Sequence, residues 1–397
     1  MKLSNNVQQL SPSLTLKISA KAKAMKKDGI PVIDFSVGEP DFFTPDNVKV
    51  AGIQAITENF TRYTQSDGIP ELKQAIINRL KIDDNLDYTA KEIIVSTGAK
   101  TSIYLALAAT VDPGDEVIVP APYWVSYPEQ VKLLGAAPIF VAMKESDNFL
   151  LTADSLKKAI TSRTKAILLN NPSNPTGSAY TEAQLKPVLE VAHRHGLFVI
   201  ADEIYSKITY PGYQFKRVVT VLPEIRNNTV IIDGASKAYS MTGWRIGYTA
   251  GPEEIIAAMK RIQDHLTSNP VSISQKAALE AFQGDQSFLE NRNREFQTRR
   301  DYLLQEFRSI PGFKTNVPQG AFYLFPNVSA LYKKSFKGKP ITSSLELCDY
   351  LLEQAHVALV PGEGFGSPDN IRISFATSMD NIREGVKRIA KAVAALD

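Results

Sequence analysis

The sequence is poor in cysteine and histidine. Its single cysteine, Cys348, cannot form a disulfide within one chain; it lies in SLELCDYLLEQA, where apolar residues recur at helical spacing, so we expect a core side chain. Of the four histidines, only His193 and His195 lie close together, in HRHG. No cluster of carboxylates or cysteines accompanies them, and a helix end before a strand explains the segment as well. We therefore predict no metal site.

An excess of charge and signs of a membrane segment are also missing. The 45 Lys and Arg residues nearly balance the 42 Asp and Glu residues, and neither sign forms a long run, so nothing indicates nucleic acid or an anionic membrane as a partner. The first residues, MKLSNNVQQL, lack the apolar core of a signal peptide. No uninterrupted apolar stretch approaches the roughly 20 residues that span a bilayer. We expect a cytoplasmic protein that acts on small molecules.

Short apolar runs alternate with helix-length segments from about residue 70 to residue 285. Runs of this length that are rich in Val and Ile are typical of buried strands in a mainly parallel α/β sheet. The chain is long enough for one large domain and a smaller companion. We predict a large domain over residues 45–285 and a smaller α+β domain built from residues 1–44 and 286–397. The predicted strands of the large domain are EIIVST, DEVIVPAP, APIFVAM, KAILLNN, LFVIADE and TVIIDGAS.

Polar and aromatic residues follow several of these strands, at the sheet edge where ligands bind in such folds. Lys237 follows TVIIDGAS; it is either a solvated charge or an amine that forms an imine with a carbonyl cofactor. Asp202 ends an apolar strand, where it needs a partner: it either caps a helix or binds a protonated pyridine nitrogen. Tyr205 could reach the same ring, and Trp124 could stack on it, although core packing is the usual fate of tryptophan.

A second set of residues suits a phosphate group. Gly98, Ala99 and Lys100 begin a predicted helix, and free N–H groups at a helix start attract phosphate, although strand-glycine-helix turns are common. Arg245, which lies within Gly-Trp-Arg-Ile-Gly, could bind a phosphate with two hydrogen bonds or form a structural ion pair, and Ser236 adds a hydroxyl. Together with the residues that suit a ring, this set predicts a site for pyridoxal 5′-phosphate (PLP).

Three separated motifs occur in an order that resembles the class I, fold-type I PLP aminotransferases: NPSNPTG at 171–177, ADEIY at 201–205 and SKAYSMTGWRIGY at 236–248. The likeness extends from GEPDF at 38–42 to RISFA around Arg372, and it implies the fold of that family. It implies that Lys237 holds PLP as a Schiff base and moves the substrate proton. It further implies ring contacts by Asp202, Asn174, Tyr205 and Trp124, phosphate contacts by Gly98, Ala99, Ser236 and Arg245, and an α-carboxylate site of Arg372, Asn174, Trp124 and Gly38. Lys100 is a further candidate for a contact to the cofactor phosphate, or it is a solvated charge at the helix start.

The same resemblance implies a homodimer with shared active sites, because Tyr63 would reach the phosphate of the neighbouring subunit. The segments PSLTLKISAKAKA and GAK are similar to the bacterial and plastid branch of the aspartate aminotransferases. In that branch Lys100, with Ser13 and Thr15, would recognise the distal carboxylate of aspartate or glutamate. The implied reaction is a ping-pong transfer from L-aspartate to 2-oxoglutarate, which gives oxaloacetate and L-glutamate.

Other functions stay open at this point. Some members of the branch also transaminate prephenate and carry a lysine before the Pro-Ser pair, where this chain has Ser11. An aromatic or broad-specificity aminotransferase and another PLP reaction, such as that of a lyase, are further alternatives. A non-catalytic PLP-binding regulator would normally carry a DNA-binding unit, and the sequence has no basic helix-turn-helix extension.

Overall fold

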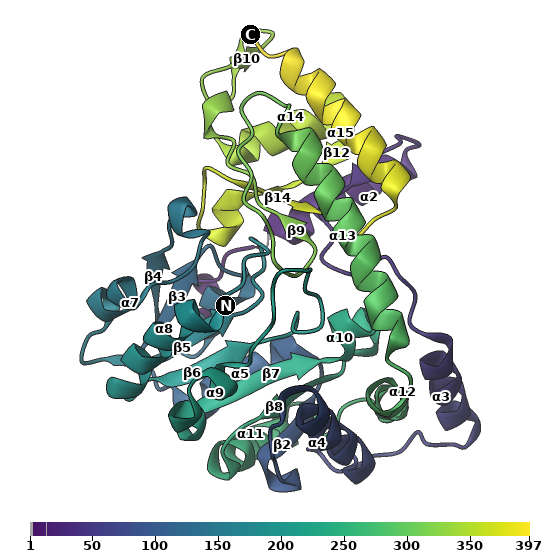
Figure 1. Ribbon diagram of the computed structural model, residues 1–397, viewed down its shortest axis with the longest axis vertical. Helices are drawn as coiled ribbons and strands as arrows, with labels where there is room; N and C mark the ends of the chain where they lie inside the picture. The colour runs from purple at the N-terminus through teal and green to yellow at the C-terminus, as the bar shows by residue number, and fades with distance from the viewer. Residues whose placement is uncertain (1–2, 13) are drawn as a thin grey trace.

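The computed structural model describes residues 3–12 and 14–397 (Figure 1). Its largest sheet has seven strands in the order β2-β8-β7-β6-β5-β3-β4. All six predicted runs form strands, and the five from β3 to β7 pair in parallel, so the expected mainly parallel α/β sheet is confirmed. The strands are β2 (Ile93–Ser96), β3 (Glu116–Ala121), β4 (Ala137–Ala142), β5 (Thr164–Asn170), β6 (Phe198–Asp202), β7 (Thr229–Gly234) and β8 (Gly247–Ala250).

Strand β8 was not predicted, and it pairs antiparallel with both β2 and β7. Its sequence, GYTA, has none of the β-branched apolar residues that are typical of the other strands. The sequence therefore contains no apolar run that would predict β8. It nevertheless matters for the site, because a Cβ on Gly247 would collide with the backbone of Gly98 and Ala99. The glycine therefore lets the turn before α5 lie directly against β8.

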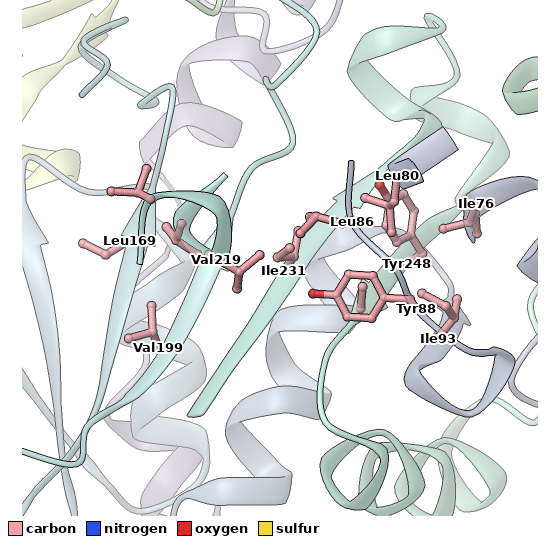
Figure 2. Close-up of a cluster of buried hydrophobic side chains, with 14 of the residues drawn as sticks. Ile76, Leu80, Leu86, Tyr88, Ile93, Leu169, Val199, Val219, Ile231 and Tyr248 are labelled. Carbon is pink, nitrogen blue, oxygen red and sulfur yellow. The ribbon is translucent and has the colours of Figure 1, made fainter. Parts of the chain in front are cut away.

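Helices cover both faces of this sheet (Figure 1). Along β7, Ile231 faces one apolar cluster, while Val230 and Ile232 face another, as expected for a strand that is buried on both sides. Figure 2 shows the first cluster, in which Ile76 and Leu80 pack near Tyr248. The helices of this region are α3 (Asp46–Thr57), α4 (Pro70–Asp84), α5 (Ala99–Thr110), α6 (Ser126–Leu133), α7 (Ala153–Ala159), α8 (Glu182–Arg194), α9 (Val218–Val221), α10 (Ala235–Ala238), α11 (Glu253–Leu266) and α12 (Ser272–Gln283).

Most residues of a second apolar cluster come from the C-terminal region, joined by Ile33 and Phe35 of the N-terminal segment and by apolar residues between 204 and 210. Ile18 and Ala22 of α2 pack with Ala358, and β1 pairs in parallel with β12. This arrangement supports the predicted two-domain division, which stays a prediction. No helix among the described residues is both long and apolar enough to cross a membrane. The elements are α1 (Asn5–Gln8), α2 (Leu14–Lys27), β1 (Ile33–Asp34), α13 (Ser287–Phe307), β9 (Tyr323–Leu324), β10 (Ser335–Phe336), β11 (Lys339–Pro340), α14 (Ser344–Ala355), β12 (Val357–Ala358), β13 (Val360–Pro361), β14 (Ile371–Ser374) and α15 (Met379–Ala394).

Candidate active site

A cavity of about 600 Å³ lies where the parallel strands end. Asn170 and Asp202 are the last residues of β5 and β6, and the chain leaves β7 directly into α10, so three adjacent strands deliver groups to one place. Most of the residues singled out from the sequence line this cavity. They are Thr15, Gly38, Ala99, Lys100, Trp124, Asn174, Asp202, Tyr205, Ser236, Lys237, Arg245 and Arg372.

Lys237 lies on the one-turn helix α10, immediately after β7. Its ammonium donates a hydrogen bond of 2.5 Å to the carbonyl oxygen of Gly38. Burial lowers the pKa of Lys237 to about 8, although the carboxylate of Glu39 acts in the opposite direction. Near neutral pH, the amine is therefore much closer to its neutral, nucleophilic form than an exposed lysine would be.

Asp202 is buried, and no described cation forms an ion pair with it. Its carboxylate accepts hydrogen bonds from the hydroxyl of Tyr127 at 2.6 Å and from the backbone N–H of Ile204 at 3.3 Å. Burial raises the pKa of Asp202 to about 6, against the effect of these two donors. Turns rather than a helix follow Asp202, which removes the helix-cap alternative. A buried carboxylate of this kind would gain free energy from a cationic ligand.

Arg372, on β14, is a buried guanidinium with neutral partners. It donates to the side-chain oxygen of Asn174 at 3.0 Å and to the carbonyl oxygen of Ser36 at 2.7 Å. The rings of Tyr323 and Phe365 flank it at 4.6 and 5.1 Å. No carboxylate among the described residues forms an ion pair with it, and its Nε has no hydrogen-bond partner there. Burial lowers the pKa of Arg372, because the guanidinium loses hydration and none of the described carboxylates pairs with it; an anionic ligand would therefore be bound favourably.

Arg245 and the turn before α5 lie in direct contact. Gly98 has a φ of +90°, and a Cβ at this position would collide with the guanidinium of Arg245. Arg245 itself adopts a left-handed conformation, with a φ of +58°, and donates to the carbonyl oxygen of Thr242 at 2.7 Å. The start of a twelve-residue helix, a guanidinium and the nearby hydroxyl of Ser236 thus surround one end of the cavity. Such a combination is suited to a phosphate group.

Lys100 lies next to this end of the cavity. Its ammonium is 4.9 Å from the centre of the Trp124 ring. Partial loss of hydration and the charge of Arg245 lower the pKa of Lys100. In the part of the chain that the structure describes, no carboxylate forms an ion pair with Lys100, and the buried hydroxyl of Thr15 has no hydrogen-bond partner. Both groups are available to a polar ligand.

The structure adds residues that the sequence analysis missed. The hydroxyl of Tyr127 binds Asp202, and that of Tyr323 lies 2.8 Å from the hydroxyl of Tyr205. Asn170 donates to the carbonyl oxygen of Asp202 at 2.9 Å and accepts from the backbone N–H of Asn174 at 2.7 Å. The signals were weak: Tyr127 lies one helical turn after Trp124, but both tyrosines occur in apolar segments that are typical of the core.

Three predicted site residues do not line the cavity of this chain. Gly98 lies against Arg245 but is not among the residues that line the cavity. Tyr63 is 90% exposed on the surface, so the single chain leaves its predicted role untested. Ser13 lies outside the described residues.

Comparisons with known proteins identify the family of this chain. The family "Aminotransferase class I and II" matches residues 30–389. The aspartate aminotransferase of Geobacillus stearothermophilus is 48% identical over 98% of each chain. The solved aspartate aminotransferase of Rhizobium meliloti superposes with a TM-score of 0.97, at 45% identity and over 100% of both chains. That of Thermus thermophilus, solved with maleate, has a TM-score of 0.93 at 36% identity, over 99% of this chain and 100% of that one. The chain therefore belongs to the class I and II aminotransferase family.

Proposed function

We propose that this protein transfers the amino group of L-aspartate to 2-oxoglutarate and yields oxaloacetate and L-glutamate, with PLP held on Lys237. The main supporting observation is the composition of one cavity. It combines an amine with a lowered pKa, a buried carboxylate without a cationic partner and a buried guanidinium without an anionic partner. These groups suit a ligand with a carbonyl carbon, a protonated ring nitrogen and a carboxylate-bearing substrate beside it.

The residues present fit PLP at each of its polar ends. Asp202 would hold the pyridine nitrogen, and its own position is fixed by Tyr127. The phosphate would lie against Arg245 and the start of α5, where a residue larger than Gly98 would displace the guanidinium. Ser236, Trp124, Asn174 and Tyr205 complete the proposed set, with Trp124 on the ring face and the last two at the phenolic oxygen.

When bound, PLP supplies a carbonyl that condenses with amines and a ring that accepts the electron pair left by loss of a Cα proton. Lys237 would hold the cofactor and would take and return that proton as a free amine, a task for which its lowered pKa of about 8 is suited at neutral pH. Asp202 would keep the ring nitrogen protonated, because an ionised carboxylate in a buried site strongly favours a cation beside it. The two residues thus divide proton transfer and charge stabilisation between them.

Arg372 would bind the α-carboxylate that every amino-acid donor carries, since its guanidinium is held in place by Asn174 and Ser36. Lys100 and Thr15 would bind the distal carboxylate, with Ser13 as a third contact. Lys100 is suited to this because its ammonium lies over Trp124 at the cavity and has no competing ion pair among the described residues. Maleate, with which the Thermus relative was solved, is a dicarboxylate, and this supports an acidic substrate here.

The exposed side chains support the proposed homodimer. Apolar residues are exposed on and just before α3, at Tyr63, and from the end of α11 to the start of α12. The hydroxyl of Ser272 donates a hydrogen bond to the carbonyl oxygen of Arg62, so the segment of Tyr63 lies against the start of α12. An exposed apolar surface of this kind is typical of subunit interfaces. We propose that a second copy covers it and that Tyr63 then reaches the partner's phosphate site. The exposed residues are Phe43, Val50, Ile53, Ile56, Tyr63, Leu266 and Val271.

The function is tested by adding single amino donors to the PLP-loaded protein and following the absorption of the bound cofactor as it is converted to pyridoxamine phosphate. We expect aspartate and glutamate to convert it much faster than alanine or phenylalanine, and 2-oxoglutarate and oxaloacetate to reverse the change. Equal rates for acidic and apolar donors would contradict the substrate assignment but leave aminotransferase activity standing. No conversion with any donor would contradict the function itself.

A further inference from the structure

Helix α10, which carries Lys237, has only four residues and cannot be stable alone. The backbone N–H groups that follow it turn back to its first two residues: that of Tyr239 donates to Ala235, and that of Met241 donates to Ser236, each at 3.1 Å. The carbonyl oxygens of Lys237 and Ala238 therefore need other donors, as the last carbonyls of any helix do.

Arg292, on α13, supplies those donors. One nitrogen of its guanidinium donates to the carbonyl oxygen of Lys237 at 3.1 Å and also to that of Ala238. The other nitrogen donates to the carbonyl oxygen of Lys207 at 3.1 Å. Asn293, the next residue, donates to the oxygen of Lys207 as well, at 2.9 Å. The guanidinium thus joins the end of α10 to the turn that follows Asp202 and Tyr205.

A buried, charged side chain is an unusual hydrogen-bond donor for backbone carbonyl groups, because burial of the charge costs free energy. Arg292 is 3% exposed, and no carboxylate among the described residues forms an ion pair with it. Burial lowers its pKa to about 10. Its compensation comes from carbonyl oxygens, including those at the negative end of α10. A role that required only packing would be served by an apolar side chain without this desolvation cost.

Helix α13 also holds the loop of Gly38, whose carbonyl oxygen accepts a hydrogen bond from the Lys237 amine. Arg299 lies seven residues after Arg292, on the same side of α13. It donates to the carboxylate of Asp41 at 2.7 Å and lies against the ring of Phe42 at 5.1 Å. Asp41 is three residues after Gly38, the residue that accepts this hydrogen bond. One helix therefore holds both the backbone of the lysine and the loop that its amine contacts; in Figure 1, α13 runs from beside α10 toward α15.

We propose that Arg292 is a positioning residue that fixes the backbone of Lys237 and thereby sets how readily its amine attacks a carbonyl carbon. This inference rests on the proposed function, because it assumes that Lys237 is the residue that binds PLP. It assigns to a residue 55 positions away in the sequence a share in the reactivity of the lysine, without contact to the cofactor or substrate.

The test measures covalent attachment of PLP to the apoprotein by stopped-flow absorbance over a range of PLP concentrations, with borohydride reduction and peptide mapping to identify the lysine. In Arg292→Met we expect the limiting attachment rate to fall about tenfold to a hundredfold, the loss typical of a misplaced reacting group. The PLP concentration at half-saturation should change by less than about twofold, because the phosphate contacts of the initial complex are untouched. Arg292→Lys retains the charge and part of the donor capacity, and should fall between Arg292→Met and the wild type.

Arg300→Met is the matched control. Arg300 lies on the same helix, is largely buried, donates to the carbonyl oxygen of Pro318 at 3.0 Å and lies over Tyr210, but it contacts neither α10 nor Gly38. Its loss should lower thermal stability and leave the limiting attachment rate unchanged. Equal attachment rates in the wild type and both Arg292 variants would overturn the proposal, as would an equal decrease in the Arg300 variant. If Arg292→Met does not fold, Arg292→Lys decides by the same comparison. Failure of the wild type to attach PLP to Lys237 would instead contradict the proposed function.

Discussion

The cavity has two regions that differ in how their charges are held. The buried region consists of Lys237, Asp202 and Arg372, whose positions are fixed by hydrogen bonds to neutral groups and whose pKa values are all shifted by burial. The outer region contains Lys100, which rests on Trp124 and is more exposed, although partial burial lowers its pKa as well; it would include the exposed Tyr63 of a second subunit. Groups in the buried region are oriented before any ligand binds, which is how an enzyme stabilises a transition state.

This contrast explains how one site could combine fixed chemistry with adjustable specificity. The buried charges correspond to the features that every amino-acid donor shares, whereas the outer charge corresponds to the side chain, which varies between donors. Substitutions in the buried region should therefore affect all substrates, and those in the outer region should affect only some. The following predictions test that difference, beginning with the largest expected effect.

Lys237→Ala should remove covalent attachment of PLP and nearly all turnover with every donor. Loss of positioned proton transfer alone accounts for about a 10²–10⁴-fold decrease, and loss of the attached cofactor adds to it. Turnover assays and borohydride reduction with peptide mapping measure the two effects. Lys91→Ala, at an exposed lysine, serves as the control and should behave as the wild type. A reduced adduct on a different lysine would contradict this assignment.

Arg372→Leu should lower kcat/KM for aspartate and for alanine by a similar factor, because both donors carry an α-carboxylate. Removing one partner of a buried charge pair costs about 2–5 kcal/mol. That range corresponds to a loss of about thirtyfold to a few thousandfold. Arg383→Leu on the exposed side of α15 is the control. A loss confined to aspartate would indicate that Arg372 binds the distal carboxylate. It would contradict the assignment of the buried region to the features that all donors share.

Asp202→Asn should stabilise the apoprotein at pH 7, although it impairs the enzyme. Since burial raises the pKa of Asp202 to about 6, the folded wild type loses stability as the pH rises from about 4 to above 6. The pKa of Asp202 is about two pH units higher in the folded chain, which corresponds to a loss of about 3 kcal/mol of folding free energy at pH 7. The uncharged amide in the variant avoids this loss. Urea unfolding of both apoproteins at pH 4 and pH 7 measures it.

The difference between the two apoproteins should be small at pH 4 and large at pH 7, and Asp28→Asn, at an exposed site, should show neither effect. With PLP bound, single-turnover measurements should show that Asp202→Asn slows Cα proton removal. A stabilisation that did not vary with pH would contradict the raised pKa of Asp202, and an unchanged single-turnover rate would contradict its role at the ring nitrogen.

Lys100→Ala should reduce kcat/KM for aspartate and glutamate about tenfold to a hundredfold, the value of a hydrogen bond to a charged group. Alanine and phenylalanine, which lack a distal carboxylate, provide the internal control and should be far less affected. Thr15→Val and Ser13→Ala should give smaller losses in the same direction, because an uncharged hydroxyl is a weaker donor to a carboxylate than an ammonium is. Equal losses for acidic and apolar donors would assign Lys100 to the cofactor phosphate instead.

Tyr63→Phe should have the smallest effect, a weakening of PLP binding by about tenfold, the lower end of the range for loss of one hydrogen bond to a charged group. Equilibrium binding of PLP to the apoprotein measures it, and sedimentation velocity shows whether the variant still forms dimers. Because the effect requires a second subunit, dilution of the wild type to monomers should weaken PLP binding at least as much. A fully active monomer would contradict the shared site.

The sequence predicted the parts of the fold that depend on local pattern. Six strands were evident from runs of Val, Ile and Leu, whereas β8 was missed because its sequence, GYTA, has small and polar residues in place of such a run. In the site, Lys237 and Asp202 were marked by their position at strand ends. Tyr127 and Tyr323 were not, because a tyrosine in an apolar segment has the same local pattern whether its hydroxyl binds a catalytic carboxylate or fills the core.

By itself, the sequence determined which strands alternate with helices and which polar residues end those strands, because both follow from side-chain periodicity and from the common direction of parallel strands. Only the tertiary structure decided which charges lack partners and what holds Lys237 in place. Arg292 lies on a helix that no local signal connects with the lysine, and its hydrogen bonds to the backbone of α10 depend on packing between distant segments. Hydrogen bonding and desolvation depend on distances in space, and these are fixed only when the chain has folded.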